Sequence, residues 1–417
     1  MPLNRQHLAD IYRPASAKPI QLSLPILTGA NSGGGNIAIT QAVDLSLPIR
    51  GLRFVLKGRI VIGTAAFTTV NPEGLLNLLN SIIIQGTNAR QQGNLTLWNI
   101  DLATAWVLQR VMGPKGAAFF LVTPPGGGAL TAVPDPTTPF PSGAVGATNP
   151  YFQGSTGTYD FIISVDFPFH PHQSNSYGRE PLTIPQYLVR NEEWKDSLQI
   201  LITGASQLGN STGALGVAAA TTTVTYTAFG TGAGSPTLDV YSLPVLMGLN
   251  LKDQILPGIM SRVATPITSP VQSAGNNVSL LNMQKQPTPR VFFKMGTGTV
   301  VPAFATLIDT VANGPQATGP NTLGVLLGGN RNVRNKIDIM AHKMQFPDVY
   351  LREPVQGYNI MDFMEQGNPD AAYPGQDIGD GATFQLTADV LGSTANGLGI
   401  AVQEQILHQP SGALMDF

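Results

Sequence analysis

The stretch from Tyr159 to Phe169, YDFIISVDFPF, has the clearest strand pattern in the chain. Apolar residues recur at every second position and mark one face: Phe161, Ile163, Val165 and Phe167. The positions between them form the other face: Ile162, Ser164 and Asp166. A period of two residues is that of a β-strand with one buried face. Such a face has to pack against a second layer of structure, so this stretch decides the fold class.

Strand-like segments with the same character recur along the whole chain. They lie at 52–57, 198–202, 238–247, 291–294, 336–340, 384–390 and 398–402. Segments rich in glycine and proline, which we expect to be loops, lie at 113–157, 296–321 and 367–381. The sequence therefore predicts two sheets packed face to face rather than a parallel α/β sheet, which needs a helix between successive strands.

Helical patterns are few and short. Asp101 is a suitable N-cap for a helix that runs to about Met112. Asn359 is a suitable N-cap for a second, shorter helix. That helix would bury Ile360, Phe363 and Met364. We expect the three tryptophans to be core anchors: Trp98, Trp106 and Trp194.

The same order of elements occurs twice in the chain. Each half reads strand, loop, strand, short helix, turn-rich loop, alternating strand, connection and alternating strand. We therefore predict an all-β chain of two tandem eight-stranded jelly rolls, a double jelly roll, with short helices and long loops. The predicted division is an N-terminal arm over 1–39, a first jelly roll over 40–245, and a second jelly roll with a C-terminal tail over 246–417.

The composition limits the classes of function that the chain can have. Only 12% of the 417 residues are charged, about half the usual share, which favours surfaces covered by neighbouring subunits. A net charge of −2 speaks against a strong chain-wide field for nucleic acid or membranes. The absence of cysteine excludes disulfides and thiolate chemistry. We expect neither a signal peptide nor a transmembrane segment, because no apolar stretch is long enough.

No set of residues forms a recognisable catalytic motif, so we predict no catalytic site, no cofactor and no metal. The histidines suit loop or structural positions: His7, His170, His172, His342 and His408. The carboxylates cluster in turn-rich polar segments: Glu192, Glu193 and Asp196, and Asp370, Asp377 and Asp380. A calcium site between Asp377 and Asp380 is the alternative for the last of these, although the segment lacks an EF-hand pattern.

Between residues 40 and 407 the layout resembles the double jelly-roll major capsid proteins of tailless, internal-membrane-containing icosahedral phages, the tectivirus-like group. The segments that carry the resemblance are GLRFVLKG at 51–58, the strand at 159–169, WKDSLQI at 194–200, the passage at 238–257, and FPDVY at 346–350. The resemblance implies a homotrimer of pseudo-hexagonal outline, with both barrels upright in the shell and the long loops outward. It also implies a place in the virion capsid, after assembly in the host cytoplasm.

The resemblance also implies partners. These are other copies of the chain, penton and minor capsid proteins, and internal membrane lipids reached by the N-terminal arm, with no specific nucleic acid. The candidate contact residues of the arm, for lipid headgroups or neighbouring capsomers, are Arg5, His7, Arg13 and Lys18. A disordered tail is the alternative for the arm. Two other functions stay open: a carbohydrate-binding or adhesin-like β-sandwich, and a β-sandwich hydrolase that uses the scattered carboxylates.

Overall fold

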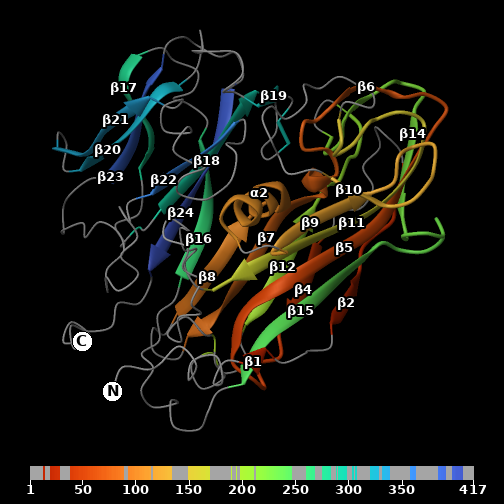
Figure 1. Ribbon diagram of the computed structural model, residues 1–417, viewed down its shortest axis with the longest axis horizontal. Coiled ribbons are helices and arrows are strands. Elements are labelled where there is room, and N and C mark those ends of the chain that lie inside the picture. The colour runs from red at the N-terminus through yellow and green to blue at the C-terminus, as the bar shows by residue number, and fades with distance from the viewer. Residues whose placement is uncertain are drawn as a thin grey trace.

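The computed structural model of the protein places the two halves side by side (Figure 1). It describes residues 13–14, 19–28, 38–88, 93–113, 116–133, 149–169, 189, 194, 198–210, 213–246, 260–267, 275–282, 288, 290–297, 303–304, 306–307, 320–327, 331–338, 357–362, 384–390 and 397–406.

The stretch that decides the fold is a central strand of the first half. It forms β11 (Gly157–Pro168), which pairs antiparallel with β5 (Ile49–Gly63) over its whole length. The four apolar residues of its predicted inner face are all buried, and Ile162 and Asp166 on the other face are partly exposed. The predicted alternation is therefore confirmed, although Ser164 on the outer face is also buried.

Two sheets enclose the core of the first half. Sheet I has the order β1-β15-β5-β11-β9-β10, and β2, β3 and β14 pair with its members. Its further strands are β1 (Arg13–Pro14), β2 (Ile20–Ser23), β3 (Leu27–Thr28), β9 (Ala118–Val122), β10 (Thr131–Ala132), β14 (Thr223–Thr227) and β15 (Thr237–Leu246). β1, β2 and β3 come from the segment predicted as an arm, and their backbones pair with β14 and β15.

Sheet II runs through both halves, in the order β19-β18-β24-β16-β8-β7-β12-β4, with β22 paired to β18. Its first-half strands are β4 (Ala38–Ala42), β7 (Leu79–Asn88), β8 (Gly93–Ile100) and β12 (Gln199–Gly204). Its second-half strands are β16 (Met260–Ile267), β18 (Arg290–Thr297), β19 (Thr306–Leu307), β22 (Tyr358–Asp362) and β24 (Gly397–Ile406). The two halves are thus joined within one hydrogen-bonded sheet.

A separate sheet completes the second half. Sheet III has the order β17-β23-β20-β21 and lies beyond β18 and β24 in Figure 1. Its strands are β17 (Gly275–Asn282), β20 (Pro320–Leu327), β21 (Arg331–Asp338) and β23 (Phe384–Val390). In the first half, β6 (Phe67–Val70) and β13 (Gly216–Ala218) form a small two-stranded sheet.

Aromatic side chains fill the core between sheets I and II. The ring of Trp98 on β8 meets Phe167 on β11 edge to face at 5.3 Å, and Phe167 lies 4.7 Å from Phe54 on β5. Trp106 packs edge to face against Phe120 on β9 at 6.5 Å. The three tryptophans are fully buried, as predicted.

The predicted helix after Asp101 is confirmed. It is α2 (Leu102–Met112), and the Asp101 carboxylate accepts hydrogen bonds from the backbone N–H and the hydroxyl of Thr104, each at 2.9 Å. A short 3₁₀ helix, η1 (Gly74–Leu78), precedes β7. No helix among the described residues is long and apolar enough to cross a membrane.

The predicted helix after Asn359 is wrong. Residues Tyr358–Asp362 form the strand β22, paired antiparallel with β18, while Phe363 and Met364 lie outside the described residues. The Asn359 side chain does accept a local hydrogen bond, from the N–H of Ile360 at 3.0 Å, as a residue with capping tendency often does. Pairing with β18 and burial of Tyr358, Asn359, Ile360 and Met361 override that local preference.

The long segment 113–157 is also not a loop throughout. Its part AFFLV forms β9, which pairs with β11 from Val122↔Phe161 to Ala118↔Val165. The surrounding glycines and prolines obscure this short strand in the sequence. Likewise β19 lies within the segment 296–321.

Candidate functional site: the buried seam between the halves

The seam between the halves begins with two strands that pair in parallel. β16 of the second half lies along β8 of the first, with Arg262 opposite Trp98 and Val263 opposite Asn99 (Figure 1). The Ser261 hydroxyl on β16 donates a hydrogen bond to the Thr96 carbonyl on β8 at 2.6 Å. Two charged clusters lie on this frame: the ion pairs of the first are within the second half, and the ion pair of the second joins the two halves.

The first cluster surrounds Glu404 on β24. The guanidinium of Arg262 donates to the Glu404 carboxylate, with Nε 2.9 Å from Oε1, and Arg290 on β18 lies 3.5 Å from Oε2. All three side chains are fully buried. Arg262 also reaches the first half. Its Nη1 donates to the Pro168 carbonyl at 2.9 Å, and its guanidinium carbon lies 4.5 Å from the ring centre of Trp98.

The second cluster surrounds Glu73, the residue before η1 in the first half. Its carboxylate accepts from the ammonium of Lys294 on β18 and from the hydroxyl of Tyr358 on β22, both of the second half. Lys294 also lies over the rings of Phe304 and Tyr358, at 4.9 and 5.6 Å. Cations over aromatic faces in a dry site gain additional stabilisation.

The backbone at Gly74 holds Glu73 in place. Gly74 has a φ of 50°, in the left-handed region that side chains rarely adopt. A Cβ on Gly74 would also lie 2.5 Å from the Cβ of Phe152. The residue after Glu73 therefore has to be glycine for this carboxylate to meet the second half.

Burial shifts the ionisation of the second cluster. It raises the pKa of the Glu73 carboxyl above its ordinary value of 4.5; the charge of Lys294 opposes this rise and that of Asp101 adds to it. Burial also raises the pKa of the Tyr358 hydroxyl well above its ordinary value, and the charge of Glu73 adds to that shift. Tyr358 therefore remains a hydrogen-bond donor to Glu73 in neutral solution.

The raised pKa of Glu73 predicts a pH dependence. A carboxyl whose pKa rises on folding binds its proton more tightly in the folded state, so its contribution to stability is fully present below 4.5 and is lost as pH rises through the folded-state pKa. We expect the stability difference between the native chain and Glu73→Gln to favour the native chain most in acid and to shrink toward neutral pH. Urea unfolding of both proteins from about pH 4 to about pH 7 measures it. A difference that does not change with pH would contradict the assignment.

The seam is suited to fixing two halves together rather than to chemistry. Its charged groups are sealed from solvent, so no substrate reaches them. Within the part of the chain that the structure describes, no group of three or more His, Cys, Asp or Glu side chains is placed to hold a metal ion.

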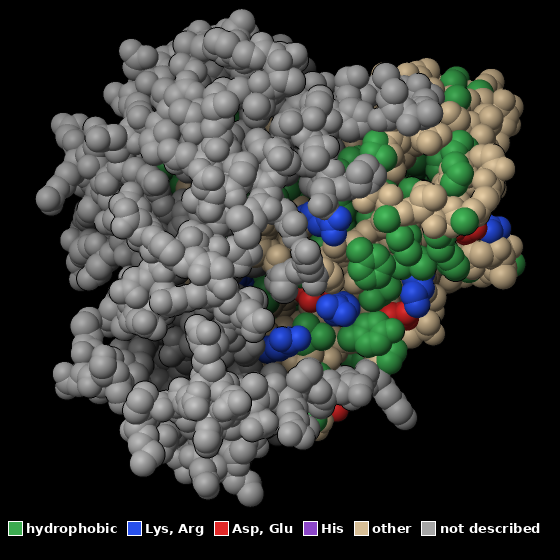
Figure 2. All heavy atoms as spheres, viewed as in Figure 1, with side chains coloured by type: hydrophobic (Ala, Val, Ile, Leu, Met, Phe, Trp, Pro, Cys, Tyr) green, Lys and Arg blue, Asp and Glu red, His purple; other side chains and the backbone are tan. Residues whose placement is uncertain are grey.

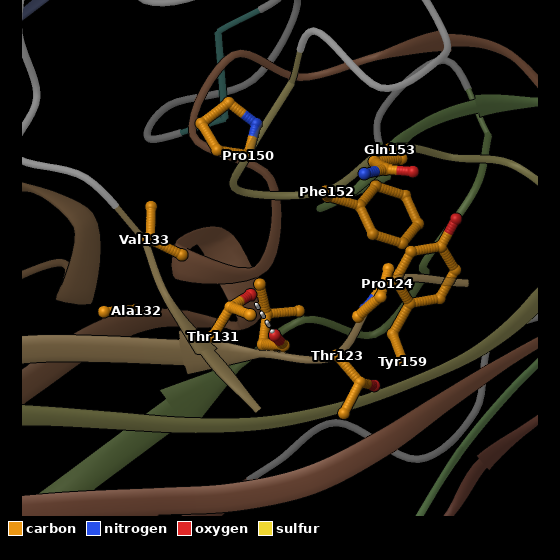
Figure 3. Close-up of a pocket in the computed structure, with 10 residues that line it drawn as sticks. Thr123, Pro124, Thr131, Ala132, Val133, Pro150, Phe152, Gln153 and Tyr159 are labelled. Carbon is orange, nitrogen blue, oxygen red and sulfur yellow. Dashed lines mark hydrogen bonds between the residues drawn. The ribbon is translucent and has the colours of Figure 1, made fainter. Parts of the chain in front are cut away.

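A hollow of about 210 Å³ lies elsewhere, beside β9, β10 and the start of β11 (Figure 3). The described residues of its lining carry no charge: Val122, Thr123, Pro124, Thr131, Ala132, Val133, Pro150, Phe152, Gln153 and Tyr159. The rings of Phe152 and Tyr159 are buried against each other, 5.2 Å apart, and burial raises the pKa of Tyr159 to about 12. Among these described residues, the hollow therefore offers no open aromatic platform for a sugar and no acid or base that is active near neutral pH.

The residues predicted for the arm are mostly outside the described part of the chain. Only Arg13 of the four lies within it, where its backbone pairs in β1 with Leu246. Arg5, His7 and Lys18 lie outside it, and so do the two carboxylate clusters with their alternative calcium site and the five histidines.

Sequence reasoning missed the seam, although a signal was present. Arg262 and Glu404 are the single charged residues of β16 and β24, and β18 carries Arg290 and Lys294, in a chain that has few charges. Charged side chains inside such strands indicate buried pairs. Their partners are not predictable from the pattern.

No protein-family model matches the chain, and no curated protein matches its sequence. Among solved structures, the chain is similar to the major capsid protein of Sulfolobus turreted icosahedral virus, with a TM-score of 0.52 and 13% identity over 94% of this chain and 98% of that one. A chain in the atomic structure of the same virus matches with a TM-score of 0.48 and 14% identity, over 94% of this chain and 92% of that one. The major capsid protein P2 of bacteriophage PM2 matches with a TM-score of 0.45 and 9% identity, over 94% of this chain and 99% of that one. The first likeness shows the fold: the chain is all-β and has the predicted double jelly roll.

Proposed function

We propose that the protein is a viral major capsid protein that assembles as pseudo-hexagonal trimers into an icosahedral shell. The observation that carries the proposal is the seam, because a shared sheet and the Glu73–Lys294 ion pair join two jelly rolls into one block. Three such blocks place six barrels around one axis, and a closed shell can be tiled from that unit. The fold shared with the capsid protein of the turreted virus supports the same function.

The finer parts of the proposal follow from the same resemblance. We propose that the chain divides at 39 and 245 into an arm and two barrels, and that the protein has no enzymatic activity. Its partners would be its own copies together with penton and minor capsid proteins. The arm with Arg5, His7, Arg13 and Lys18 would face an internal membrane. The protein would be located in the virion capsid after assembly in the host cytoplasm.

The test is the mass and shape of the purified protein. We expect light scattering after size exclusion to give about three times 44.0 kDa, and negative-stain images to show particles of pseudo-hexagonal outline. A chain that stays monomeric at high concentration would contradict the proposal. Specific hits on a glycan array would instead favour the carbohydrate-binding alternative.

A further inference from the structure

The outer face of sheet I carries an apolar stripe across three neighbouring strands. We define it as Phe119 and Leu121 on β9, Ile162 on β11, and Val55 on β5. The register aligns these residues in two rows: Phe119, Ser164 and Val55 in one, and Leu121, Ile162 and Lys57 in the next. Figure 2 shows hydrophobic side chains on this open face with charged ones interleaved. Phe119 is 36% exposed, whereas its neighbour Phe120 points into the core and is 1% exposed.

The charges around the stripe neutralise one another. Arg53 pairs with Asp166 at 2.6 Å, Lys57 with Asp239 at 2.6 Å, and Arg59 with Asp160 at 2.7 Å, each across adjacent strands. These three pairs sum to zero charge, and Arg50 on β5 adds one cation that also acts on Asp166. An apolar centre within a rim of paired charges is the anatomy of a protein–protein interface.

The middle of the stripe is already dry. Ser164 lies between Phe119 and Val55 in its row, is 0% exposed, and has no hydrogen-bond partner for its hydroxyl among the described residues. A sheet face turned permanently to water rarely leaves a hydroxyl unsolvated, because desolvation without a partner costs free energy. This observation favours a surface that functions without water.

We propose that the apolar stripe binds a second copy of the chain. The inference rests on the proposed function, because each barrel in a closed ring of six needs two neighbours. For the first jelly roll, one neighbour is its own second half, which joins along β8 of sheet II. Sheet I is the opposite layer of that sandwich, and Phe119 on its outer face is 36% exposed, so this face can take the other neighbour, a barrel of the next copy.

The charge around the stripe also favours a second copy of the chain as its partner. A face whose cations are mostly paired with carboxylates has little long-range attraction for nucleic acid or anionic lipid headgroups. It suits a partner that is itself poor in charge. This chain, with 12% charged residues and a net charge of −2, is such a partner.

The chain has no cysteine, so single cysteines report on the stripe without background. Phe119→Cys places a thiol in the stripe, and Val217→Cys is the matched control. Val217 is similarly exposed at 38%, but it lies on β13 of the small two-stranded sheet. In the oligomer we expect maleimide to label Phe119→Cys about tenfold more slowly than Val217→Cys, because an interface core excludes water. After unfolding in urea, the two thiols should react at equal rates.

Equal labelling of the two thiols within an intact oligomer would overturn the inference and leave the proposed function standing. An unmodified chain that forms no oligomer would overturn the proposed function itself. Hydroxyl-radical footprinting of the unmodified oligomer serves as a second measurement in case Phe119→Cys does not fold. It should leave Phe119 as little oxidised as its buried neighbour Phe120, and preferential oxidation of Phe119 would overturn the inference.

Discussion

Replacing Glu404 with glutamine should lower the free energy of unfolding by about 3–5 kcal/mol, because it removes a buried negative charge that two buried guanidinium groups contact. Glu404 lies between Arg262 and Arg290, and all three side chains are fully buried. Glutamine has nearly the same shape, so the change removes the charge and one acceptor with little effect on packing. Two cations would then repel each other in a site that water does not reach.

The matched control is Asp166→Asn on the outer face of sheet I. Asp166 also accepts from an arginine, Arg53, with Nε 2.6 Å from its carboxylate, but the Arg53 side chain is partly exposed. The Arg53 side chain is 38% exposed and that of Asp166 is 14% exposed, so this pair is only partly desolvated and its loss should cost less than that of the fully buried cluster. Denaturant unfolding of both variants gives the comparison. Equal losses in the two variants would contradict the larger cost expected for the fully buried cluster.

The sequence predicts the fold well where a single local rule decides the structure. The alternation from Phe161 to Phe167 requires a strand with one buried face, and the packed partner sheet follows from it. Asp101 followed by Leu102 and Ala103 predicts α2, because a cap and a helical pattern coincide there. At these positions the local sequence is sufficient, and the identity of the neighbouring strand is not needed.

Prediction from sequence fails where distant partners decide the structure. Asn359 has the local chemistry of a cap, yet β18, far away in the chain, takes the segment into a sheet. The seam is the extreme case, because Glu73 and Lys294 are 221 positions apart. Their unusual placement is visible as isolated charges, but their proximity depends on how the two barrels dock.

This dependence on docking bears on the proposed function. Hydrophobic contact between two barrels permits many relative orientations, because it is not directional. Buried ion pairs and a shared sheet are directional, and a misaligned seam would leave charges unpaired at high cost. Since a shell subunit repeats one geometry many times, the seam is a device for keeping the two barrels in a single orientation.

Trp98 connects the seam to the core of the first half. We expect Trp98→Ala to lower the free energy of unfolding by about 3–5 kcal/mol. Its ring packs on Phe167 and beneath the guanidinium of Arg262, and its indole N–H donates to the Pro168 carbonyl at 3.0 Å. Alanine would leave a cavity and remove the ring that Arg262 covers. The control is Trp106→Ala, which removes an equally buried ring that packs on Phe120 and Tyr151 within the first half. Hydrogen exchange separates the two effects: Trp98→Ala should accelerate exchange in β16 and β24 of the second half, and Trp106→Ala should not. If both variants accelerate it equally, Trp98 stabilises the first half alone and does not couple the two.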